Sequence, residues 1–114
     1  MNSLAEVTVE LQGASVVARL KGEVDMTNAT WVHDELLHSV PNGAIRLVVD
    51  LSETRYLDSA AIALLFDIAK RLGRRRQLLR IVMPKGSPLE RVLELTDVGT
   101  VAPIHGSLDS ALAE

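Results

Sequence analysis

The chain has 114 residues and a net charge of −3, with 47% hydrophobic and only 3% aromatic residues. One domain, residues 1–114, accounts for this length, and its core must be filled by Leu, Val, Ile and Ala. The acidic balance and the scarcity of aromatic side chains argue against direct binding to nucleic acid or to anionic lipid.

The chain contains no cysteine, which excludes disulfides and thiolate metal sites. Its first residues, MNSLAEVTVE, lack the basic and apolar blocks of a signal peptide. No apolar run is long enough to cross a bilayer. We therefore expect a cytoplasmic protein without membrane insertion.

Two alternating segments open the chain. Val7, Val9 and Leu11 alternate with polar residues, and the pattern resumes over residues 16–20 after a break at Gln12-Gly13. Strands joined so briefly form an antiparallel hairpin. The polar positions predict one solvated face or a place near the sheet edge.

A first helix is predicted over residues 29–40. Thr27 is a suitable N-cap, and Met26 and Trp31 have the spacing of a hydrophobic staple. The segment Pro41-Asn42-Gly43 ends this helix.

The middle of the chain predicts a parallel crossover. Ile45 to Leu51 is a nearly continuous apolar run, as in strands covered on both faces. Asp58 to Leu72 has the apolar periodicity of a helix, and Leu78 to Met83 is another buried strand. A strand, a helix and a strand of this size form a right-handed crossover.

Shorter elements follow. Pro88 suits the first turn of a helix over residues 87–95, and residues 100–104 read as a short strand. Pro103 places that strand at a sheet edge. Ser107 is suited to cap the last helix. The predicted order is ββαβαβαβα, an α/β (α+β-like) fold with a mixed sheet and an N-terminal antiparallel hairpin.

Ser59, at the start of the central helix, is the first candidate for chemistry. With Asp58 it suits a helix cap. It also suits a phosphoacceptor, because a phosphate there would meet free backbone N–H groups and the positive end of the helix. Asp58 opposes a phosphate by like-charge repulsion. The roles of helix cap and phosphoacceptor are compatible at Ser59.

Other site chemistries find less support. The sequence around Ser59 is LDSAA rather than GxSxG, and the three histidines, His33, His38 and His105, belong to segments predicted to lie elsewhere. Three carboxylates at strand ends, Asp25, Asp50 and Asp58, are explained more simply as caps and turn residues than as a metal or phosphoryl site. No glycine-rich phosphate loop is present. We expect no enzyme activity, no metal and no cofactor.

Four stretches together resemble a known family. Residues 20–25 (LKGEVD), residues 48–52 (VVDLS) followed by Thr54, residues 57–61 (LDSAA) and residues 89–96 (LERVLELT) are similar to motifs of STAS domains of the anti-sigma-factor antagonist type. The resemblance covers nearly the whole chain and implies the STAS fold.

The resemblance also implies a function. An unphosphorylated protein of this type binds an anti-sigma factor that is a serine protein kinase, which releases a sigma factor. The kinase then phosphorylates the antagonist, and a serine phosphatase restores it. By position Ser59 is the phosphoacceptor, and we expect a monomer or weak dimer. The predicted partner-binding residues are Glu23, Asp25, Thr54, Asp58, Ala60 and Ala61.

One departure bears on this expectation. The family has a second hydroxyl residue and a glycine after the serine, where this chain has Ala60 and Ala61. Alanine adds a methyl group where glycine would allow close approach of a partner. The alternative function is therefore a STAS subunit that docks constitutively, on the ATPase of an ABC lipid-transport system or in a larger signalling complex. A small enzyme using Ser59 or the carboxylates is a third hypothesis.

Overall fold

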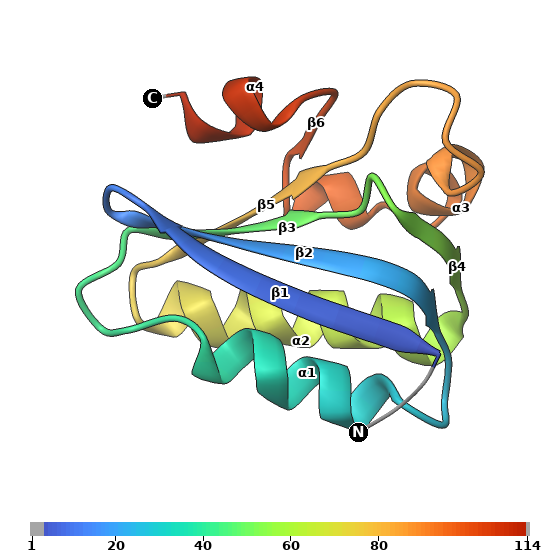
Figure 1. Ribbon diagram of the computed structural model, residues 1–114, viewed down its shortest axis with the longest axis horizontal. Helices are drawn as coiled ribbons and strands as arrows, with labels where there is room; N and C mark the ends of the chain where they lie inside the picture. The colour runs from blue at the N-terminus through green and yellow to red at the C-terminus, as the bar shows by residue number, and fades with distance from the viewer. Residues whose placement is uncertain (1–3, 114) are drawn as a thin grey trace.

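The computed structural model describes residues 4–113 as one mixed sheet with helices on both faces (Figure 1). The six-stranded sheet has the order β1-β2-β3-β5-β6, and β4 pairs with β2. Only the β1–β2 pair is antiparallel among the described pairings. The elements are β1 Ala5–Gln12, β2 Ser15–Val24, α1 Ala29–His38, β3 Arg46–Asp50, β4 Thr54–Leu57, α2 Ser59–Arg74, β5 Leu78–Val82, α3 Glu90–Leu95, the 3-10 helix η1 Val98–Thr100, β6 Ile104–His105 and α4 Leu108–Leu112.

The predicted α/β fold with an N-terminal hairpin is confirmed. In Figure 1, α1 and α2 lie side by side beneath the sheet, and α4 lies on the opposite face. All five residues of β3 are buried, in agreement with the continuous apolar run that predicted a central strand. Ile45, at the start of that run, is 44% exposed and lies outside the strand.

The predicted element order lacked β4, the strand Thr54–Leu57. This strand has four residues, only its two ends are buried, and no apolar run announces it. It continues beside β2 where β3 ends, because β2 is ten residues long and β3 only five. A register shift between Gly22 and Glu23 marks the change of partner. The 3-10 helix η1 was also absent from the prediction.

The first helix begins differently from the prediction. Its N-cap is Asn28, and Thr27 instead donates from its backbone and hydroxyl to Asp25. Met26 is 78% exposed, so the predicted staple with Trp31 is wrong. The Thr27 hydroxyl bonds to the Asp25 carboxylate and does not cap the helix, and the N-cap position falls at Asn28.

Three later boundaries also moved. α2 runs past the predicted end at Leu72 to Arg74. α3 begins at Glu90, so Pro88 lies before the helix and not in its first turn. The strand expected over residues 100–104 is reduced to Ile104–His105, and its place at the sheet edge is confirmed.

The last helix, α4, is held on the sheet by two arginines. Ser107 caps it by accepting from the Ser110 backbone N–H at 3.2 Å, as predicted. Arg46 donates to the Leu112 carbonyl at 3.0 Å, and Arg80 donates to two further carbonyls at the same end. Cations at a helix C-terminus are favourable because they meet unpaired carbonyls. α4 covers a small apolar cluster of Val17, Val48, Val82 and Ala111.

Among the residues that the structure describes, no helix has the length and apolar character needed to cross a membrane.

Candidate functional site

Asp58 joins the start of α2 to the loop after β2. It is the N-cap of α2, with extended backbone, and its Oδ1 accepts from the Ala61 backbone N–H at 3.0 Å. Its Oδ2 accepts from the Met26 backbone N–H at 2.9 Å. The backbone N–H of Asp58 donates to the Val24 carbonyl at 3.2 Å. One carboxylate thus fixes two segments 32 residues apart in the sequence.

Asp25 lies in that second segment and is held as a carboxylate. Its Oδ1 accepts from the Thr27 hydroxyl at 2.5 Å and from the Thr27 backbone N–H at 2.8 Å. These bonds, the hydroxyl first, keep the pKa of Asp25 below its ordinary value of 3.8. Buried Asn28 fixes the loop from below, because its side chain accepts from Asp25 N–H and donates to the Glu23 carbonyl. The negative charge therefore has a defined position.

Ser59 is exposed at the first residue of α2. Within residues 4–113, its hydroxyl makes no hydrogen bond, and neither its backbone N–H nor that of Ala60 has an acceptor. A hydroxyl in this position is accessible and stands at the positive end of a 16-residue helix. We call the surface formed by Asp25, Met26, Asp58 and Ser59 the acidic tip.

Two large, exposed side chains belong to the segments that lead into the acidic tip. Met26 is 78% exposed although its backbone is pinned to Asp58, and Tyr56 of β4 is 51% exposed. Large apolar side chains on a surface with fixed backbone are typical of protein contacts. Sequence analysis missed both residues, because Met26 resembled a staple and Tyr56 lay in an unrecognised strand.

The structure buries two residues predicted to bind the partner. Thr54 is 3% exposed, and its hydroxyl donates to the Leu20 carbonyl, which ties β4 to β2. Ala61 is 1% exposed, so its methyl group faces the core and not the contact surface as expected. Ala60 is partly buried, and Glu23 lies with its carboxylate 3.9 Å from Arg55. Of the predicted set, Ser59 is exposed, and Glu23, Asp25, Asp58 and Ala60 are partly exposed.

The other predicted candidates make structural contacts. Asp50 Oδ1 accepts from the Ser52 backbone N–H at 2.9 Å, which confirms its role as a turn residue. His33 bonds to Asp67 of α2 and His105 bonds to Ser110, and within residues 4–113 neither histidine bonds to Ser59. Among the described residues, no group of three or more His, Cys, Asp or Glu side chains is arranged to hold a metal ion.

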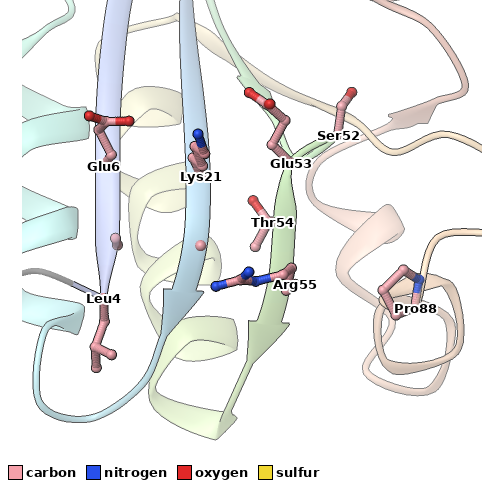
Figure 2. A pocket seen from close by; sticks show the side chains of 10 residues that line it. Leu4, Glu6, Lys21, Ser52, Glu53, Thr54, Arg55 and Pro88 are labelled. Atoms are coloured by element: carbon pink, nitrogen blue, oxygen red, sulfur yellow. The ribbon is translucent and has the colours of Figure 1, made fainter.

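A hollow of about 640 Å³ opens on the sheet face beside β4, away from the acidic tip (Figure 2). It lies where β2 exchanges β3 for β4, and buried Ala5, Gly22 and Thr54 form its floor. In Figure 2, Lys21 projects from β2 and Arg55 extends from β4 toward it. Cations and carboxylates alternate around the rim, so the hollow selects neither sign of charge. The full lining is Leu4, Ala5, Glu6, Lys21, Gly22, Ser52, Glu53, Thr54, Arg55 and Pro88.

Comparison with known proteins identifies relatives along the whole chain. An anti-sigma-F factor antagonist of Mycobacterium tuberculosis, RsfA, is 26% identical over 115 residues, covering 99% of this chain and 89% of RsfA. BtrV of Bordetella bronchiseptica, whose name also contains the words anti-sigma factor antagonist, is 28% identical over 109 residues, covering 95% and 92%.

Solved structures agree. The crystal structure of an anti-sigma factor antagonist from Mycobacterium paratuberculosis superposes with a TM-score of 0.84 at 27% identity, covering 95% of this chain and 91% of the other. The family model described as "Mlab, STAS domain" matches residues 7–109. The match spans the hairpin, the sheet and the acidic tip, and the chain therefore belongs to the STAS domain family.

Proposed function

We propose that this protein is an anti-sigma factor antagonist switched at Ser59. Its acidic tip binds an anti-sigma factor of the serine-kinase type, which frees a sigma factor. The named relatives support the class of function. The observation that carries the switch is the exposed, unbonded Ser59 hydroxyl at the start of α2, directly after the fixed carboxylate of Asp58.

The switching chemistry is a phosphoryl transfer catalysed by the partner. The Ser59 oxygen bonds to the γ-phosphorus of ATP, the bond from that phosphorus to the ADP oxygen breaks, and the hydroxyl proton passes to a base of the kinase. A phosphatase reverses the state by adding water across the new P–O bond. This protein supplies the acceptor oxygen, and the ATP belongs to the kinase.

Phosphorylation changes the charge of the tip. It adds about −1.5 to −2 charges next to Asp25 and Asp58, whose carboxylates already lie there. A partner that matches the acidic tip must present Arg or Lys side chains and a place for Met26. Extra charge left unpaired in that contact costs several kcal/mol, enough to end binding while the fold stays intact.

A second candidate function is constitutive docking without phosphorylation. Both Asp58 oxygens already accept backbone N–H groups at the tip, and among the described residues neither Asp25 nor Asp58 forms an ion pair with Lys or Arg. A phosphate at Ser59 would therefore gain no cation from this chain. This arrangement favours a STAS subunit that docks in one state, on the ATPase of an ABC lipid-transport system or in a larger signalling complex.

The test is phosphate transfer from ATP by a serine-kinase-type anti-sigma factor from the same organism. We expect the mass of the wild-type protein to rise by one phosphate, located at Ser59 by peptide sequencing. Ser59→Ala should gain no mass and should stay bound to the kinase. Ser110→Ala is the matched control, because Ser110 is also an exposed helical serine, and it should be modified like the wild type.

Two outcomes decide between the candidates. If the kinase binds the wild type but transfers no phosphate, constitutive docking replaces the switch. If it binds neither wild type nor Ser59→Ala, the proposal that the kinase is the partner fails.

A further inference from the structure

β1 leaves one long edge of the sheet open. It is the first strand in the sheet order, at one edge of the sheet (Figure 1). Within residues 4–113, no strand pairs with the side of β1 that faces away from β2. β1 has eight residues and pairs with β2 without a register shift, so the strand contains no bulge. An edge of this kind is a template for another strand.

The backbone groups on this edge belong to apolar residues. A two-residue turn, with Gly13 at φ +63°, joins Gln12 to Ser15. In a hairpin with such a turn, the two residues that flank the turn form a hydrogen-bonded pair. Hydrogen-bonded pairs alternate along an antiparallel ladder. The N–H and C=O groups of Val7, Val9 and Leu11 therefore point away from β2 and toward an incoming strand.

The side chains of Val9 and Leu11 add an exposed apolar surface beside this backbone edge. Val9 is 43% exposed and Leu11 is 69% exposed, both on the helix side of the sheet. Proteins usually protect such an edge with proline, lysine, a bulge or an inward charge. Between Ala5 and Gln12 the sequence AEVTVELQ contains no proline, lysine or bulge, and its charged residues, Glu6 and Glu10, lie on the opposite face from Val9 and Leu11.

The opposite row of β1 is acidic, which disfavours pairing with a second copy in the register centred on Thr8. Glu6, Thr8 and Glu10 lie on the open sheet face, and Arg19 of β2 pairs with Glu10 at 2.7 Å. Two β1 strands paired antiparallel about Thr8 would bring Glu6 opposite Glu10 of the other copy. Like charges directly opposite destabilise such a pair. The charge pattern instead fits a strand with basic residues on that face.

We propose that the β1 edge is a second docking site, which adds an extended segment of another protein with alternating basic and apolar residues. Its basic side chains lie opposite Glu6 and Glu10, and its apolar side chains cover Val9 and Leu11. The backbone bonds supply affinity and the two rows of side chains supply selectivity. This site is separate from the acidic tip, so its occupancy does not depend on the state of Ser59.

The probe is a capped peptide of seven residues in which lysine and valine alternate. In NMR titrations of the 15N-labelled protein, we expect saturable shifts and slowed hydrogen exchange at the amides of Val7, Val9 and Leu11. Binding should weaken with added salt, because the lysine–glutamate contacts are exposed. Leu11→Lys places a charge on the apolar row and should weaken binding about tenfold.

Leu95→Lys is the matched control. Leu95 is 68% exposed, against 69% for Leu11, and it lies on α3 away from β1. This variant adds the same charge and should bind the peptide like the wild type. A peptide with the same composition, but with its lysines in one block and its valines in another, should not protect the β1 amides.

Three results would overturn the proposal. The first is equal binding of a glutamate–valine peptide, since charge would then select nothing. The second is equal binding by Leu11→Lys and the wild type. The third is a wild-type dimer in light scattering that Leu11→Lys abolishes, because the occupant would then be a second copy.

Discussion

Asp58 is the residue on which the geometry of the acidic tip depends. Asp58→Ala removes the bonds to the Ala61 and Met26 backbones, and we expect the free energy of unfolding to fall by about 1–2 kcal/mol. Chemical denaturation measures this change. Asp109→Ala, at an exposed first-turn position of α4, should change stability much less. Equal losses in the two variants would show that Asp58 has no special role.

Asp67 tests the electrostatics between α1 and α2. Arg71 and then His33 hold the pKa of Asp67 below its ordinary value of 3.8, with both donors 2.7 Å from Oδ2. A lowered pKa means that the carboxylate stabilises the fold above pH 3.8, and that this contribution is lost as pH falls through the folded value. The free energy of unfolding should therefore lose the Asp67 contribution only below pH 3.8.

Arg71→Gln removes the larger of the two causes. We expect the Asp67 carboxyl to titrate at higher pH in this variant, measured by 13C NMR of the side chain. Lys70→Gln changes the neighbouring charge without touching Asp67 and should leave the titration in place. An Asp67 titration that stays the same in Arg71→Gln would contradict the assignment.

The residues of the site were only partly predictable. Ser59 and Asp58 were found because capping residues before an apolar helical run are a local signal. The inward direction of Thr54 and Ala61 was not, because it depends on how β4 and α2 pack on β2. Met26 was misassigned for a related reason: Asp25 captured Thr27 and moved the helix start to Asn28.

At the scale of elements, Gly22 decides whether β2 can change partners. Its φ is +103°, and a Cβ built there would lie 2.2 Å from the Leu4 carbonyl oxygen. Gly22→Ala should lower the free energy of unfolding by about 2 kcal/mol or more. Gly73→Ala is the control, because nothing lies within 4 Å of its Cβ position inside α2. It should stabilise by up to about 1 kcal/mol.

Thermal and denaturant unfolding of both variants measures this contrast. A Gly22→Ala protein as stable as the wild type would contradict this prediction. It would mean that the β2 backbone does not need the positive φ of Gly22 to change its partner strand.

The long elements were predictable and the short ones were not. β3 and α2 carry continuous apolar runs or a clear helical stripe. β4, η1 and β6 have two to four residues, and the two strands form because β2 and β5 offer them hydrogen bonds. Such pairing depends on tertiary structure, which local patterns do not encode.

At the scale of the whole molecule, the sheet separates two surfaces. The acidic tip forms where the end of β2 and the start of α2 meet, and the β1 edge runs along the outside of the sheet (Figure 1). The helices α1 and α2 share one face of the sheet and fix the tip from behind. The rigid core therefore presents two separate surfaces to partners.

The most direct test of the switch is the affinity of the kinase-type anti-sigma factor for the protein with serine and with phosphoserine at position 59. Calorimetry without ATP measures both forms. We predict that phosphoserine weakens binding on the order of 100-fold, while circular dichroism and the unfolding midpoint stay close to those of the serine form. Equal affinity of the two forms would contradict the central claim that charge at Ser59 controls the acidic tip.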